Sequence, residues 1–177
     1  MNIQYPHPDA DRFFRDIALC VTTYRGRGPA MVWPAGAATV VGACDSRSPD
    51  PDAGRALDGR AAPPALRAAE PPMREMADHL SGFVRRPVHA RYWSLGAGQR
   101  TAPHTLEHDA VLLQLAGSCE CRVAGAGPGP GGDSGPAGPR VRVRLRAGEA
   151  LYVARRGSYA LAEVHSHCTL VQFQLGA

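Results

Sequence analysis

Two histidines and a later run of polar side chains are the residues whose types and spacing could do chemistry. His104 and His108 stand four positions apart in HTLEH, two residues before the apolar run VLLQL. Because side chains alternate across a strand, both imidazoles are expected on one face. Imidazole transfers protons near neutral pH and is a common metal ligand. The segment therefore predicts either acid–base chemistry or metal binding.

Four more polar side chains, those of Tyr159, Glu163, His165 and His167, share one parity near the end of the chain. Tyr159, Glu163 and His167 are also spaced by four residues. If they face the same interior as the two histidines, five groups surround one cavity. In one interpretation His104 or His108 is a base and Tyr159 or Glu163 an acid; in another the cluster holds a relocated metal. The structural alternative makes His108 and His167 core histidines, with Tyr159 filling space.

The text HTLEH also matches the HxxEH motif of metalloproteases. That motif requires a helix, which places both histidines on one face. Here Pro103 and the following VLLQL favour a strand, so we set the match aside.

The elements that would position these groups are short β-segments. From residue 88 onward, glycines separate seven apolar or alternating stretches, a pattern typical of a barrel or sandwich. In RVRVRLR the arginines alternate with aliphatic residues, which predicts a half-buried strand and, less directly, an anion-binding face. The stretches are 88–95, 108–117, 119–125, 140–148, 150–154, 158–164 and 167–175.

The first 84 residues predict helices and a few strands. Apolar spacing favours helices at 9–20 and 73–84, while MVWP (31–34) and ATVVGA (38–43) indicate β-segments. We divide the chain into an N-terminal α/β segment that packs on the barrel, a flexible loop, and the barrel with a Gly/Pro-rich loop. Their ranges are 1–46, 47–72, 73–177 and, for that last loop, 124–139.

Composition limits the classes of partner. The chain has 177 residues, which suits one domain, and a net charge of +4 with 6% aromatic residues, which gives little basis for nucleic-acid binding. All 20 basic residues are arginine, as in proteins of high-GC bacteria. We find no signal peptide and no apolar run of about 18 residues, so we expect a cytoplasmic protein that binds no nucleic acid and no membrane.

Five cysteines without CxxC spacing predict reduced thiols, and we expect Cys119 and Cys121 to be small buried residues.

Residues 73–175 resemble the cupin-type JmjC oxygenases, the group that includes the ribosomal oxygenases. The text that carries the resemblance is RRPVHARYWSLGAGQRTAPHTLEHDAVLLQLAG, LRAGEALYVARRGSY and the closing HSHCTLVQFQL. The resemblance implies a mostly β fold, a double-stranded β-helix (cupin/JmjC-like barrel) with a short N-terminal α/β segment. It also implies a site for Fe(II) and 2-oxoglutarate inside the barrel.

The positions that bind iron in this family are mostly replaced. The facial triad consists of two histidines and one carboxylate. By resemblance, His104 occupies the first histidine position, Leu106 the carboxylate position and Tyr159 the second histidine position. Cys119 stands where these enzymes have a basic residue for 2-oxoglutarate. We therefore expect a degenerate site with no metal and no cofactor.

Three functions follow from these residues. The first is a cupin-like protein that has lost the oxygenase site and binds or transforms a small molecule or peptide, in bacterial specialised-metabolite biosynthesis. The second is a metal-free or rewired isomerase, cyclase or lyase with His104 or His108 as base. The third is a non-catalytic partner of an active homologous oxygenase, or a homo-oligomer. The expected catalytic residues are His104, His108, Tyr159 and Glu163, and the expected ligand-binding residues are His167, Gln114 and Arg91.

Overall fold

Ten strands and three helices make up the part of the chain that the computed structural model describes, residues 8–45, 64–125 and 140–176. The helices are α1 (Pro8–Tyr24), α2 (Ala37–Asp45) and α3 (Pro71–Val84). The strands are β1 (Ala30–Val32), β2 (Arg67–Ala68), β3 (Val88–Leu95), β4 (His104–Thr105), β5 (Asp109–Ala116), β6 (Ser118–Ala124), β7 (Arg140–Arg146), β8 (Ala150–Val153), β9 (Ser158–Ala162) and β10 (Cys168–Leu175).

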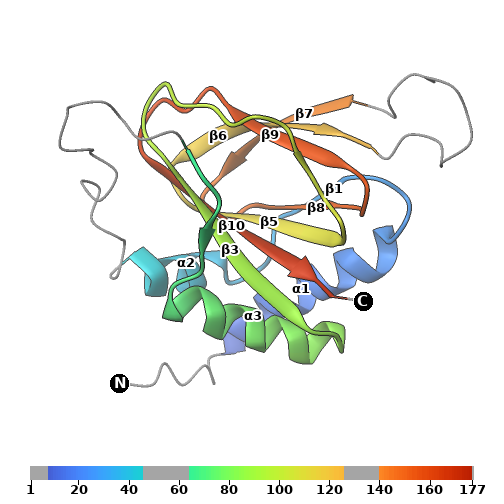
Figure 1. Cartoon of the computed structure of the whole chain (residues 1–177). Helices are drawn as coiled ribbons and strands as arrows, with labels where there is room; N and C mark the ends of the chain where they lie inside the picture. The colour runs from blue at the N-terminus through green and yellow to red at the C-terminus, as the bar shows by residue number, and fades with distance from the viewer. Residues whose placement is uncertain (1–7, 46–63, 126–139, 177) are drawn as a thin grey trace, which may run out of the picture.

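The strands form two antiparallel sheets that face each other, and the helices lie beneath one of them (Figure 1). The six-stranded sheet has the order β1-β8-β5-β10-β3-β2, and the four-stranded sheet the order β4-β9-β6-β7. The seven stretches predicted from residue 88 onward all form strands, with ends within a few residues of those expected. Non-consecutive strands are neighbours in both sheets, as the expected barrel requires.

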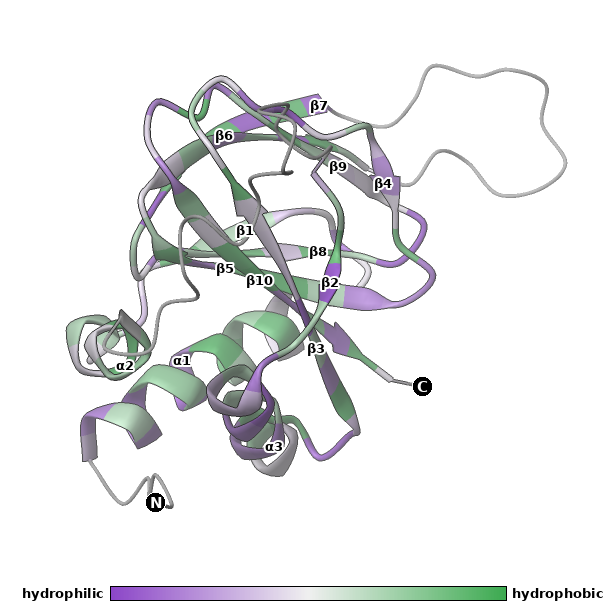
Figure 2. Ribbon diagram, turned by 60° about the vertical axis from the view of Figure 1, so that its left-hand side comes forward, coloured by the Kyte–Doolittle hydropathy of each residue, from purple (hydrophilic) through white to green (hydrophobic). Residues whose placement is uncertain are grey.

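The six-stranded sheet is buried on both faces, so the molecule has two hydrophobic cores. One face packs on the helices through side chains that include Phe14 and Phe173. The other encloses the barrel interior with the four-stranded sheet, where Leu95, Leu112 and Leu170 are fully buried. Strands buried on both sides read as continuous apolar runs, and the central strands β5 and β10 are coloured largely hydrophobic in Figure 2.

The four-stranded sheet has one apolar and one charged face. Cys119 and Cys121 lie fully buried in the barrel interior, whereas the β7 arginines are exposed. All five cysteines are free and buried. The half-buried strand predicted for RVRVRLR and the buried small residues predicted for Cys119 and Cys121 are therefore confirmed.

The β-segment predicted at 38–43 is wrong, because this stretch lies in helix α2. Gly36 precedes the helix with φ of 79°, and a Cβ there would lie 2.3 Å from the carbonyl oxygen of Asp9. This close approach places Val40, Val41 and Cys44 against the core, where they are buried. Packing of these side chains overrides the strand preference of a Thr-Val-Val run.

The segment expected as a flexible loop at 47–72 is described only from residue 64 onward. Within that part β2 pairs with β3, and α3 begins at Pro71 with prolines in its first turn. Proline suits this position because the first helical N–H groups have no intrahelical partner. Helix α3 packs against α1 and β3 and so belongs to the helical layer. The Gly/Pro-rich loop at 124–139 lies outside the described residues beyond position 125.

Candidate functional site

His104 and Tyr159 face each other across two paired strands at the mouth of the barrel. They are register partners of β4 and β9, and their ring centroids lie 5.5 Å apart. The indole of Trp93, on β3 of the opposite sheet, lies 6.2 Å from the His104 ring. The structure thus brings together two of the residues expected at one site and adds an aromatic side chain that we had not expected there.

The hydroxyl of Tyr159 is committed to two hydrogen bonds. It accepts one from the indole N–H of Trp93 at 2.7 Å and donates another to the side-chain oxygen of Gln172. Tyr159 is 1% exposed, and burial raises the pKa of its phenol. The phenol therefore stays neutral, and its proton is held by Gln172.

His104 is a half-buried titratable side chain of the same region. Its pKa is lowered, first by burial and second by the positive charge of Arg91, so the imidazole is neutral at neutral pH. Among the described residues no hydrogen bond to this imidazole is found. Arg91 is exposed, and its guanidinium donates one hydrogen bond to the carbonyl of Leu66 at 3.2 Å. We call His104, Arg91, Trp93, Tyr159 and Gln172 the barrel mouth.

His108 does not join the barrel mouth. The chain bends between Leu106 and His108, and the strand alternation on which the prediction relied is lost there. Leu106 points into the barrel interior and is 3% exposed. His108 instead lines a cavity outside the barrel, next to Asp109. The predicted single face for His104 and His108 is wrong for this reason.

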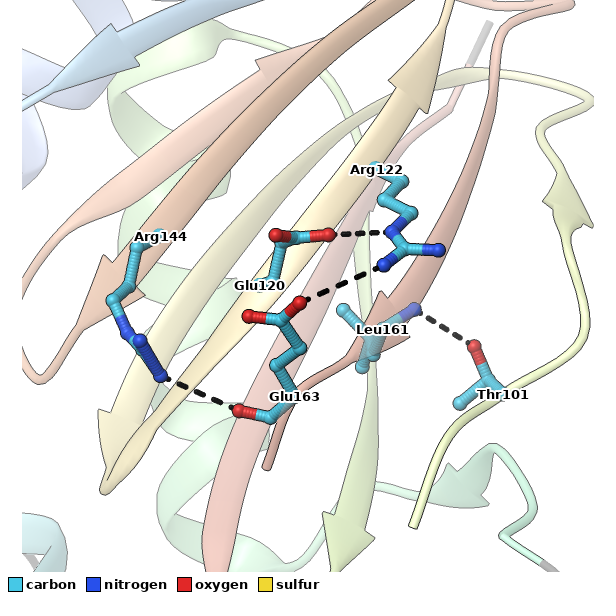
Figure 3. Close-up of polar contacts among 6 residues, drawn as sticks. All are labelled: Thr101, Glu120, Arg122, Arg144, Leu161 and Glu163. Carbon is cyan, nitrogen blue, oxygen red and sulfur yellow. Dashed lines mark hydrogen bonds and ion pairs between the residues drawn. The ribbon is translucent and has the colours of Figure 1, made fainter. Parts of the chain in front are cut away.

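Glu163 lies on the outer face of the four-stranded sheet (Figure 3). Its φ of 49° breaks the alternation after β9, and its side chain is exposed. The carboxylate lies 3.8 Å from the guanidinium of Arg122, which also pairs with Glu120. The expectation that Glu163 faces the cavity is therefore wrong, because a left-handed residue reverses the side-chain direction.

His167 and Gln114 have structural partners away from the mouth. The Nε2 atom of His167 lies 3.0 Å from the hydroxyl of Ser94. Gln114 is fully buried and donates to the carbonyl of Ala116 at 2.6 Å, while its oxygen accepts from the thiol of Cys119 at 3.3 Å. The pKa of that thiol is raised by its hydrogen bond with Cys168 and by burial, so it stays protonated.

Sequence reasoning missed Trp93 and Gln172. Both lie on the barrel-facing side of their strands, and the odd–even alternation of RYW and VQFQ was the signal that could have indicated this. Among the described residues, no three His, Cys, Asp or Glu side chains lie close enough together to hold a metal ion. No helix within the described ranges is long and apolar enough to cross a membrane.

Comparison with known proteins gives similarity of structure but not of sequence. No protein-family model matches the chain, and no curated protein matches it in sequence. Among solved structures, a Pseudomonas putida prolyl-4-hydroxylase aligns with 90% of this chain and 97% of its own, at 11% identity and a TM-score of 0.59. This similarity extends over the helical layer as well as the barrel.

Two further structures match only part of the fold. The Drosophila melanogaster CENP-C cupin domain aligns over 49% of this chain and 59% of its own, at 16% identity and a TM-score of 0.40. A vicilin from Corylus avellana (hazelnut) aligns over 51% and 24%, at 14% identity and a TM-score of 0.42. The alignment thus spans less than two thirds of both neighbours. The chain has a mostly β fold, a double-stranded β-helix of cupin type, as expected from the sequence.

Proposed function

We propose that this protein is a degenerate member of the JmjC-like cupins that has lost Fe(II)/2-oxoglutarate chemistry and binds a small molecule or peptide at the barrel mouth. The observation that carries the proposal is the hydrogen-bonded chain from Trp93 through Tyr159 to Gln172. By the resemblance of the sequence, Tyr159 stands at the position of the second histidine of these iron enzymes. A role in bacterial specialised metabolism belongs to the same proposal and rests on the composition, the small size of the chain and the replaced site residues.

The residues at the triad positions do not fit iron. Leu106 offers no donor atom and is buried in the apolar barrel interior. The oxygen of Tyr159 keeps its proton and already has two hydrogen-bond partners. His104 alone remains as a ligand, and a single imidazole does not form the three-ligand site that Fe(II) oxygenases use.

The mouth instead offers groups that suit a carboxylate. Arg91 is an exposed cation that can form paired hydrogen bonds with a carboxylate. His104 is a neutral donor or acceptor next to it, and Trp93 adds an aromatic ring. A ligand carboxylate would use Arg91 and His104, whereas Trp93 is 7% exposed and offers a ligand little surface. Acid–base catalysis by His108 or Glu163 is not part of this proposal, because neither faces the mouth.

The proposal is tested with metal-free protein and three carboxylate probes: 2-oxoglutarate, succinate and benzoate. Amide NMR spectra should show shifts at the barrel mouth with at least one probe. The Arg91→Gln variant should bind the carboxylate probe at least about tenfold more weakly than the parent, since it loses a charge-assisted hydrogen-bonded pair. The matched control is Arg142→Gln on the exposed face of β7, which removes the same charge and should change nothing. Equal losses in both variants, or no shifts at the mouth with any probe, would contradict a carboxylate site there.

A second candidate function is a non-catalytic partner subunit. It is favoured by the leucine side chains that fill the barrel interior, which leave it packed as a core. In this case the chain should form a defined heteromer with a homologous active oxygenase from the same genome. Sedimentation of the mixed proteins checks this, and two independent species would argue against it.

A further inference from the structure

A polar cavity lies outside the barrel, where five segments of the chain meet. Its volume is about 600 Å³, within the range of small-molecule sites. The ends of α1, α3 and β10 and the β8–β9 turn converge on the same side of the molecule, next to the C-terminus (Figure 1). We call this cavity the arginine pocket. Its polar lining consists of Arg25, Arg86, His108, Asp109, Arg155 and Arg156.

The charges of the arginine pocket are strongly unbalanced. Among the described residues that line it, four guanidinium groups stand against one carboxylate, that of Asp109. Both oxygens of this carboxylate already face donors: one accepts the backbone N–H of Arg155 at 2.9 Å, and the other lies 3.9 Å from Arg25. Among the described residues no carboxylate lies within ion-pair distance of Arg86, Arg155 or Arg156. These three cations therefore have no ion-pair partner within the part of the chain that the structure describes, although they share the cavity with Asp109.

The backbone holds two of these arginines in a constrained turn. Arg156 has a φ of 65°, a left-handed conformation that favours glycine or asparagine. Its N–H donates to the carbonyl of Leu106 at 2.7 Å, and Leu106 in turn donates to the carbonyl of Gly157 at 2.9 Å. Strained non-glycine residues that persist in this way are concentrated at functional sites. The turn fixes the two adjacent arginines at the edge of the cavity.

We propose that the arginine pocket binds the phosphate or pyrophosphate group of a small molecule. Guanidinium groups form bidentate hydrogen bonds with phosphate oxygens, and several of them together neutralise a multiply charged anion. A single carboxylate would leave most of this positive charge without a partner. The pocket is lined by different residues from the barrel mouth, so this inference does not rest on the function proposed above.

The experiment uses inorganic pyrophosphate as the probe and succinate as a carboxylate control. Calorimetric titration of the full chain should give one pyrophosphate site, with weaker or no binding of succinate. Arg155→Gln should weaken pyrophosphate binding by about tenfold or more, because one charge-assisted contact is lost. Arg142→Gln, which removes an equal charge from the other sheet, should bind within about twofold of the parent.

A third variant separates a ligand role from a structural one. Arg156→Gly removes the backbone strain together with the guanidinium, so the chain should unfold at a higher temperature and yet bind pyrophosphate less tightly. No measurable binding at millimolar pyrophosphate, or an equal loss in Arg142→Gln, would overturn the proposal. Tighter binding of a single-stranded oligonucleotide than of pyrophosphate would also overturn it, in favour of a nucleic-acid surface.

Discussion

The barrel mouth and the arginine pocket use polar residues in opposite ways. In the mouth the hydroxyl of Tyr159 is buried and has a partner for each hydrogen bond that it makes. In the arginine pocket Arg86, Arg155 and Arg156 have no carboxylate partner within the described part of the chain. Buried polar groups must be satisfied by partners within the protein, whereas exposed cations such as Arg155 and Arg156 are hydrated and can also bind an anion. A polar residue near a cavity therefore indicates a binding function only when its own bonds remain free.

Among the changes that test this comparison, removal of the Tyr159 side chain should have the largest effect on stability. Tyr159→Ala should lower the free energy of unfolding by about 3–5 kcal/mol, because it leaves a cavity in the barrel interior and two unpaired polar groups. Urea unfolding followed by circular dichroism measures the change. Tyr24→Ala, at a position 44% exposed, is the control and should stay within about 0.5 kcal/mol of the parent. A small loss at Tyr159 would show that its side chain is not packed in the barrel interior.

Removal of the hydroxyl alone sharpens the same point. Tyr159→Phe should cost about 1–3 kcal/mol, since Trp93 and Gln172 each lose a buried partner. If the hydroxyl and Gln172 act as a pair, combining Tyr159→Phe with Gln172→Leu should cost less than the two changes added together. Strict additivity in the urea midpoints would contradict the hydrogen-bonded chain.

The arginine pocket should respond in the opposite direction. Arg156→Gly should raise the free energy of unfolding by about 1 kcal/mol, because glycine adopts the left-handed conformation without steric cost. Arg155→Gly is the matched control; it lies in the same turn without a positive φ and should not stabilise the chain. Equal effects of the two substitutions would mean that backbone strain is not concentrated at Arg156.

The smallest expected effect is a pH dependence that originates at His104. Its folded pKa lies below the ordinary value, so the unfolded chain binds more protons at this position. Stability from this group is therefore complete above the ordinary pKa and falls as the pH drops from about 7 towards 5. Urea unfolding at both pH values should show a smaller acid loss in His104→Asn than in the parent. His165→Asn, at an exposed position, should keep the parental loss.

The barrel could be predicted from the sequence because each strand carries its own local pattern. From β3 onward, glycines and alternating apolar residues mark seven strands, all except the two-residue β4. In this region the local sequence preference matches the secondary structure that packing stabilises. Helix α2 could not be predicted, since Thr39, Val40 and Val41 favour a strand locally and become helical only through packing. Local pattern and tertiary packing agree in one region and disagree in the other.

The candidate site was only partly predictable, for a different physical reason. The pairing of His104 with Tyr159 follows from the barrel topology, so the resemblance placed both residues correctly in one region. His108 and Glu163 were misplaced, because a bend at 106–108 and a left-handed residue at 163 each break the two-residue period. The arginine pocket joins five separate segments and has no signal in any one of them.

We propose that this cupin barrel does not support iron chemistry, and the iron content of the purified protein tests this most directly. The purified chain is reconstituted anaerobically with Fe(II) and 2-oxoglutarate, exchanged into metal-free buffer and measured by plasma mass spectrometry beside His104→Ala. We expect no stoichiometric iron and no difference between the two proteins, because Leu106 and Tyr159 supply no further ligand. Stoichiometric iron that disappears in His104→Ala would contradict the account.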